Sequence, residues 1–398
     1  MTGAVGSRQA AAALRVDTPV VVLNTHHSGL AIARDLAPLG VRVIGLTAMA
    51  NFHGNRSRFL EYRPSPDSLT EQPQLLSFLL KLASEIPTRP ILLPTRDHDI
   101  NFISRQREAL DRCFIIPMLK PEALDRVMNK DALAAVASTV GVQTPRTITV
   151  DRAEDITAAA SLRFPCICKP VYASQWRKPG IWEAVGRQKA MRVESFNELE
   201  SFYSNFMRLD PLVCVQEWVE GEEQDLVIFG SYCSDDGDVV ASFTARKRLQ
   251  FPPLAGTGIV VEALPLPQLE QPSRALLTAI NFRGVSEIEY KRDPRSGKLY
   301  LIEVNPRHWD QHGLGTQVGV NLSEALYRDV TGQARRNMKQ DPGSRLWIAE
   351  AEYSRHLVRC LLGRAPMRDA TLALGARRTW AVFDGNDLHP FLSLLGLK

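Results

Sequence analysis

The chain has 398 residues, 44% of them hydrophobic, and a formal net charge of +4. This length allows two or three domains, while the mild charge fits an anionic substrate and lacks the concentrated basic tract of a nucleic-acid binder. No apolar run is long enough to cross a membrane, and six cysteines without a CxxC pair indicate reduced thiols. We therefore expect a cytoplasmic protein, without nucleic-acid or membrane partners and compatible with a homodimer.

The first part of the chain predicts a parallel α/β sheet. Residues 1–17 are interpreted as a disordered tail, and the apolar run 20–23 follows as a buried strand. A helix over residues 30–39 and a strand over residues 41–46 complete a β-α-β unit. The turn between strand and helix lacks the full dinucleotide glycine pattern, which argues against an NAD site. We expect an N-terminal domain with a Rossmann-like sheet over residues 18–120.

Polar residues follow two of these strands. Asp97 comes shortly after the buried strand 91–94, and His26 and His27 lie in the turn after the first strand. Open α/β sheets bind ligands just beyond the carboxyl ends of their strands. These residues are candidates for contact with a substrate, and a capping or turn role is an equally good interpretation.

Two lysines come next along the chain. Lys130 opens a predicted helix that ends at Gly141, and Lys169 ends the apolar strand 164–170 just before a proline. A solvated role would explain Lys130 alone. It fits Lys169 poorly, because Lys169 directly follows an apolar strand.

Two later strands carry a pattern of hard oxygen ligands. Residues 285–290 predict one strand and residues 299–307 the next, joined by a tight turn at 293–297. Glu303, Asn305 and Arg307 alternate and therefore share a face. Together with Glu289 on the neighbouring strand, the carboxylates and the amide suit Mg²⁺, and the arginine suits phosphate. The pattern predicts a nucleotide-dependent phosphoryl-transfer site.

These segments, in this order, resemble the ATP-grasp superfamily. The match includes Lys130, the segment Gly141–Pro145, the strand ending at Lys169 and the Glu289, Glu303 and Asn305 set. The resemblance implies an α/β, α+β ATP-grasp fold with an N-terminal parallel-sheet domain, a small mobile lid and a C-terminal antiparallel-sheet grasp domain. It implies a linker helix and lid over residues 121–219, a catalytic domain over 220–398, and ATP with two Mg²⁺ ions, which Mn²⁺ could replace.

The same resemblance implies roles for residues along the nucleotide. Lys130 and Lys169 would reach its phosphates, and Gln216 would face the adenine amino group. Glu217 and Val219 would offer backbone groups to the adenine ring. The ribose would be bound by Glu223, with Glu222 or Asp225 as alternatives.

A subgroup of the superfamily, the bacterial carboxylate-amine ligases of the D-aspartate ligase-like group, is similar in further segments. It lacks the lid glycines, as residues 171–180 do here, and it has a lysine-alanine pair matched by Lys189 and Ala190. Residues 245–253 and the Gly256–Gly258 segment also match. We see no chemistry in residues 338–398, whose aromatic residues are interpreted as packing anchors.

The resemblance implies an ATP-dependent ligase that phosphorylates a carboxylate and passes the acyl group to an amine, releasing ADP and phosphate. Arg307 is the candidate for holding the oxyanion, with Lys247 and Arg248 binding the carboxylate or the phosphoryl group. Either of the latter two could instead be a solvated residue at a strand end. The substrates would be a small carboxylate and an amine, such as amino acids or peptides. A carboxylase or purine-pathway enzyme that uses carboxyphosphate, and a non-catalytic nucleotide-binding protein, remain alternatives.

Residues 308–312 follow the metal strand and are the expected specificity determinants. A zinc site at His308 and His312 is disfavoured, because two histidines in a loop are too few for a closed site.

Overall fold

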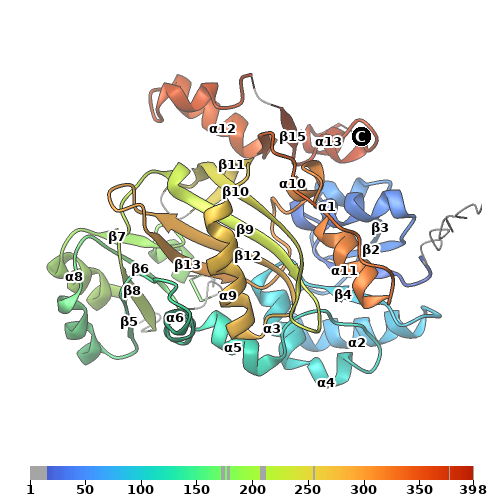
Figure 1. The fold of residues 1–398 in the computed structure, drawn as a ribbon, viewed down its shortest axis with the longest axis horizontal. Coiled ribbons are helices and arrows are strands. Elements are labelled where there is room, and N and C mark those ends of the chain that lie inside the picture. The colour runs from blue at the N-terminus through green and yellow to red at the C-terminus, as the bar shows by residue number, and fades with distance from the viewer. Residues whose placement is uncertain are drawn as a thin grey trace, which may run out of the picture.

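The computed structural model describes most of the chain, and its strands within that part form three sheets (Figure 1). The predicted tail falls almost wholly outside the described residues, as does most of the loop 171–180. The described residues are 16–171, 175–176, 180–206, 212–253, 256–375 and 377–397.

The N-terminal sheet is parallel, as predicted, with the strand order β3-β2-β1-β4. Every residue of β1 and β2 is buried, because helices and the rest of the molecule cover both faces of the sheet. The elements of this part are β1 (Val20–Leu23), α1 (His27–Leu36), β2 (Val43–Thr47), β3 (Glu61–Pro64), α2 (Gln72–Ser84), β4 (Ile91–Leu93), α3 (Asp97–Arg105) and α4 (Arg107–Leu110).

The turn after β1 is shorter than expected, because α1 already begins at His27. Asn24 adopts a positive φ of 82°, which turns the chain at once into the helix. A Cβ on Gly29 would lie 2.1 Å from the Asn24 carbonyl oxygen, so a glycine is needed in the first helical turn. Gly29, predicted to lie in a turn, thus lies within a helix, where it allows the backbone to approach Asn24 closely.

The smallest sheet is antiparallel, with the strand order β5-β8-β6-β7. It has a core of its own that includes Val150, Cys166, Cys168 and Trp176. Figure 1 shows it in green beside the central sheet. The elements leading to it and forming it are α5 (Pro121–Met128), α6 (Lys130–Thr139), β5 (Thr147–Val150), β6 (Cys166–Pro170), α7 (Ile181–Ala184), β7 (Met191–Val193), α8 (Phe196–Phe206) and β8 (Val213–Glu217).

The central sheet has the order β13-β12-β9-β10-β11-β14-β15, and only its last pair is parallel. Helix α9 lies across one of its faces (Figure 1). Its elements are β9 (Leu226–Cys233), β10 (Val239–Phe251), β11 (Thr257–Ala263), α9 (Glu270–Ile280), β12 (Gly284–Arg292), β13 (Leu299–Asn305), β14 (Arg345–Ile348) and β15 (Arg378–Trp380). Residues 338–398 therefore do more than pack, because two of their strands extend this sheet.

The hairpin between β12 and β13 forms as predicted. The Gly297 amide donates to the Asp293 carbonyl at 2.8 Å, and Gly297 has a φ of +69°. The second strand is shorter than predicted, however. It ends at Asn305 because Pro306 has no N–H to donate to the sheet, so Arg307 lies beyond the strand.

Three of the C-terminal helices pack against the N-terminal domain, and α12 lies against the central sheet. Asp387, just before α13, accepts hydrogen bonds from the Ser57 hydroxyl at 2.7 Å, the Arg58 amide at 3.0 Å and Arg34 Nε at 3.1 Å. This single carboxylate fixes the C-terminal segment to α1 and to the loop after β2. The helices of this part are α10 (Gly313–Gln317), α11 (Leu322–Val330), α12 (Glu350–Leu361) and α13 (His389–Leu394). A search of the described helices finds no candidate with the length and apolar character of a membrane span.

Candidate active site

A cavity of about 680 Å³ opens between the three sheets and receives most of the predicted site residues. They come from the small sheet, from the central sheet and from helix α6. Together with N-terminal residues such as Asp97, they surround one space. The predicted residues that line it are Lys130, Lys169, Lys189, Gln216, Glu217, Val219, Lys247, Glu289, Glu303, Asn305 and Arg307.

The predicted metal ligands form one polar face on β12 and β13. Glu289 lies directly opposite Glu303 in the sheet register, and Glu287 lies opposite Asn305. The Asn305 side-chain amide donates to Glu303 at 3.0 Å and to Glu287 at 3.1 Å. Two carboxylates and an amide oxygen are thus gathered on neighbouring positions, a donor set that fits Mg²⁺.

Lysines compensate the charge of this face. Lys247 Nζ lies 2.7 and 2.8 Å from the two Glu289 oxygens. Burial would lower the pKa of Lys247, but Glu289 and Glu287 outweigh it and raise that pKa above its usual value. Lys247 is therefore a fully charged partner of the predicted metal site.

Lys130 plays the matching part for Glu303, with its Nζ 3.8 Å from a carboxylate oxygen. Asn129 caps helix α6 by accepting from two backbone amides, which fixes Lys130 in the first turn. Burial would raise the pKa of Glu303, but Lys130, then Lys247, and the Asn305 hydrogen bond lower it to about 2. The carboxylate is ionised throughout the physiological range.

Lys169 and Gln216 meet on adjacent strands of the small sheet. Lys169 Nζ donates to Gln216 Oε1 at 2.9 Å, and Gln216 Nε2 donates to the Thr147 hydroxyl at 2.9 Å. Burial lowers the pKa of Lys169, and nearby Lys130 lowers it further. A polyanion between the two lysines would relieve their mutual repulsion.

The predicted adenine-binding residues 216–219, which we call the hinge, lie at the end of β8 and are only partly available for a ligand. The Glu217 amide donates to the Arg146 carbonyl at 2.9 Å, and its side chain accepts from the Arg163 amide at 2.9 Å. The Glu217 amide and side chain are thus already bonded within the chain. Val219 lines the cavity beyond it.

The predicted ribose ligands are not among the cavity residues. Glu223 accepts from the Gln250 amide at 2.6 Å, and Asp225 pairs with Arg292 at 3.0 Å. Glu222 lies 3.6 Å from Arg368. Gln250 itself and Lys291 line the cavity at this end, and a ribose role for the three acids stays a prediction.

Arg248 is also placed away from the cavity. Its Nη1 lies 2.7 Å from Glu262, which also binds Arg246. Successive side chains of a strand point to opposite faces, so the inward direction of Lys247 sends Arg248 outward. A role of Arg248 in binding substrate or phosphate stays a prediction, and its contact with Glu262 does not support it.

Arg307 joins the metal face to the N-terminal domain. Its Nε lies 2.7 Å from Asp97, and its Nη2 donates to Asn305 Oδ1 at 3.4 Å. Burial would lower the pKa of Arg307, but Asp97 raises it above the usual value. Arg307 and Asp97, two candidates from distant parts of the sequence, thus meet in the cavity.

The segment after Arg307 divides between cavity and core. Trp309, Asp310 and Gln311 line the cavity, as expected of specificity determinants. His308 and His312 are instead buried below it, where His312 Nε2 lies 3.4 Å from Asp35. His312 thus packs against α1, and His308 lies beside Ser323 of α11.

Glu287 is the site residue that the sequence interpretation missed. It lines the cavity and is buried, and burial, then Glu289, raises its pKa well above the usual value. Its position two residues before Glu289 on a strand was a usable signal, because such residues share a face.

Comparisons with known proteins support the family resemblance. No family model matches the chain. A D-aspartate ligase of Enterococcus faecium is 23% identical over 273 residues, covering 65% of this chain and 64% of that protein. The match thus spans slightly less than two thirds of that relative's length. A D-alanine–D-alanine ligase of Xanthomonas axonopodis pv. citri is 25% identical over 237 residues, covering 56% of this chain and 70% of that protein.

Solved structures agree on the architecture. An ADP complex of N5-carboxyaminoimidazole ribonucleotide synthetase superposes with a TM-score of 0.66 at 13% identity, covering 88% of this chain and 86% of that one. The chain has the ATP-grasp fold. An L-amino acid ligase from Bacillus licheniformis is similar as well, with a TM-score of 0.60 at 14% identity, covering 82% of this chain and 78% of that one. The D-aspartate ligase match agrees with the predicted resemblance.

Proposed function

We propose that this ATP-grasp protein is an ATP-dependent ligase that joins a small carboxylate to an amine, releasing ADP and phosphate. The observation that carries the proposal is the face formed by Glu289, Glu303 and Asn305 in a cavity that also contains Lys130 and Lys169. Oxygen ligands and ammonium groups in one cavity are the parts that phosphoryl transfer requires. The names of the sequence relatives, both amino-acid ligases, support amino-acid or peptide substrates.

ATP would lie with its phosphates between the lysines and its base toward the hinge. Lys130, Lys169 and Lys189 supply positive charge along this part of the cavity. Lys189 Nζ donates to the Thr257 hydroxyl at 2.9 Å, so it approaches from the lid side onto β11. The ADP complex of the similar synthetase supports a nucleotide in this fold.

The donor set of the metal face fits Mg²⁺, and we propose two ions held by Glu289, Glu303 and Asn305. Bound Mg²⁺ neutralises phosphate charge and polarises the transferred group. Lys247 is bound to Glu289 and would remain its ion-pair partner as ligands bind. Glu303, ionised by its lysine neighbours, needs no deprotonation before it binds a cation.

In the first half-reaction, a substrate carboxylate oxygen attacks the γ-phosphorus and the bond to the ADP oxygen breaks. In the second, the amine attacks the acyl carbon, orthophosphate leaves, and the amine loses a proton. Arg307, held by Asp97 at 2.7 Å, is placed to stabilise the oxyanion of that step. Lys247 is the second candidate for contact with the phosphoryl group.

The proposal is tested by screening pairs of amino acids for ADP formation with mass detection of the product. Amide or peptide formed in step with ADP supports it, and AMP as the stoichiometric product contradicts it. The structural similarity to a carboxyaminoimidazole synthetase and to a Campylobacter jejuni biotin carboxylase favours a second candidate, a carboxyphosphate-using enzyme. ADP formation that requires bicarbonate, and no amino-acid carboxylate, would support that alternative.

A further inference from the structure

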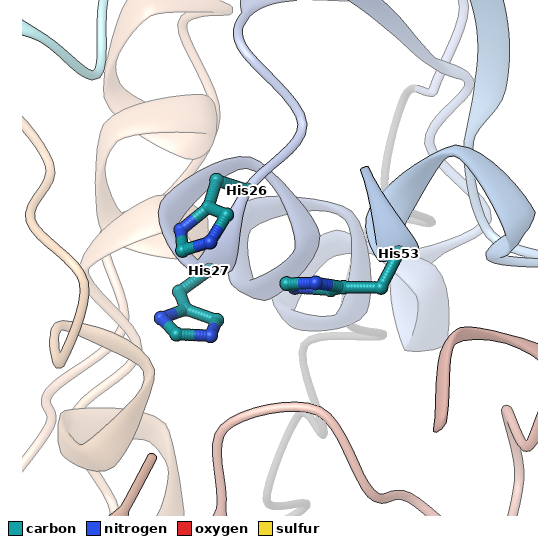
Figure 2. Close-up of side chains that lie close together, drawn as sticks. All are labelled: His26, His27 and His53. Carbon is teal, nitrogen blue, oxygen red and sulfur yellow. The ribbon is translucent and has the colours of Figure 1, made fainter. Parts of the chain in front are cut away.

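Three histidines gather at the N-terminal end of the cavity. His26 and His27 lie at the start of α1, and His53 opens the short helix η2 (His53–Arg56). The ring centroids are 4.0 Å apart for His26 and His27, and 5.0 and 5.1 Å from each of these to His53. Figure 2 shows the three rings drawn together from these two elements. One ring nitrogen of each lies within 4.8 Å of the others.

The backbone is built to bring these elements together. A Cβ on Gly54 would lie 1.9 Å from the Thr25 carbonyl oxygen, so only glycine allows η2 to approach the start of α1 this closely. Asp387 fixes the same region through Ser57, Arg58 and Arg34. The histidine cluster is therefore held by fixed backbone, a prerequisite for a specific site.

One nitrogen in the cluster has no partner within the described chain. His53 is only 6% exposed, and its Nε2 is buried without a hydrogen bond. Buried polar atoms normally have partners, so an orphaned ring nitrogen beside two other imidazoles indicates a missing ligand.

Imidazole nitrogens offer the lone pairs that bind metals, and His26 and Asp310 line the same cavity.

We propose that His26, His27 and His53 bind a divalent transition-metal ion such as Zn²⁺. Three imidazole nitrogens form a known zinc ligand set that leaves one position open. His26 lines the cavity beside Ser28 and Asp310, so the open position faces the substrate space. Nitrogen ligands select a softer ion than the oxygen ligands of Glu289 and Glu303, so the two sites take different metals.

The aromatic surroundings support the same conclusion. The Phe52 ring meets His26 edge-on with centroids 5.2 Å apart, and Trp347 meets His27 edge-on at 5.8 Å. Such walls fix ring orientation and limit water access to a metal. Another group of potential ligands, His356, Cys360 and Asp369, is less suited, because His356 is already paired with Asp369 at 2.9 Å.

The test uses the full chain without a histidine tag, stripped with a chelator and titrated with Zn²⁺ and with Co²⁺. We expect one tightly bound ion per chain by metal analysis and the visible absorption of four-coordinate Co²⁺. The readout needs no substrate and is therefore independent of the proposed ligase activity. No bound Zn²⁺ and no Co²⁺ spectrum in the folded protein would overturn the proposal.

Variants locate the ion. His26→Gln changes a half-buried ligand with little risk to folding, and His53→Gln changes the buried one. Each should weaken Zn²⁺ binding by more than the roughly 10- to 100-fold cost of losing an outer-shell partner. His356→Gln, at a histidine paired with Asp369 outside the cluster, should bind as the wild type does. Unchanged affinity in a folded His26→Gln protein, or equal loss in His356→Gln, would refute the assignment.

Discussion

The two ends of the cavity are built from different chemistry. One end, where we propose that the ATP phosphates bind, is called the phosphate end. There, strong charges neutralise one another within the chain, as in the pairs of Lys247 with Glu289 and Lys130 with Glu303. At the N-terminal end, neutral imidazoles such as His27 and His53 lie against aromatic rings. The difference indicates that the phosphate end is organised for a highly charged ligand common to the fold, whereas the N-terminal end can vary with the substrate.

The largest effect should follow a change at the phosphate end. Glu303→Gln keeps the shape but removes an ionised ligand, and we expect a rate loss of about a thousandfold or more with every amine substrate. Steady-state ADP formation measures it, with Glu108→Gln as a control at an exposed glutamate. Near-normal activity of Glu303→Gln would contradict the metal-site assignment.

Arg307 lies where the two ends meet, and Arg248 provides its matched comparison on the outer face of the same sheet. Arg307→Ala should lower the rate on the order of a hundredfold, as the loss of an oxyanion donor does. Arg248→Ala should lose far less, because its partner Glu262 lies outside the cavity. Equal losses in the two variants, with both folds intact, would reverse our distinction between them.

The small sheet should respond to nucleotide and the N-terminal sheet should not. We predict that the described residues between 164 and 219 close over ATP, because Lys169 and the hinge would contact it from one side only. Hydrogen exchange with and without a non-hydrolysable ATP analogue should show about tenfold slower exchange there than in the free protein, equivalent to about 1.4 kcal/mol. Equal exchange in both states would argue against a lid.

The smallest effect concerns acid. Burial, then His312, lowers the pKa of His308 well below its usual value, whereas in the unfolded chain it titrates near 6.5. As pH falls below 6.5, His308 takes up a proton in the unfolded state but not in the folded state. The free energy of unfolding therefore falls by up to about 1.4 kcal/mol per pH unit. His308→Asn should flatten the change in Tm between neutral and mildly acidic pH, whereas His389→Gln should not. An unchanged slope in His308→Asn would exclude this role.

Much of the phosphate end could be predicted from sequence because its residues are local to strands. Glu303 and Asn305 share a face by alternation alone, and Glu289 follows from the hairpin turn. The fold followed from the same segments, and the structural similarities confirm it. Glu287 was equally accessible by that rule and was overlooked.

The remaining differences depend on partners from other strands. Arg248 points away from the cavity by the same alternation that turns Lys247 inward, and Glu262 of β11 binds it there. Glu223 is occupied by the Gln250 amide from a distant strand. The histidine cluster was half visible, because His26 and His27 are adjacent, but His53 joins them only through the close packing at Gly54.

The bond network of Asp387 has a consequence for how the protein is made. Ser57 and Arg34 leave the ribosome more than three hundred residues before the carboxylate that fixes them. The parallel sheet can assemble early, but the loop that carries His53 acquires its last support only when synthesis is nearly complete. During synthesis, the parallel sheet would thus form before the loop that carries His53 is fixed. A chain truncated before Asp387 should lack the hydrogen bonds that hold this loop.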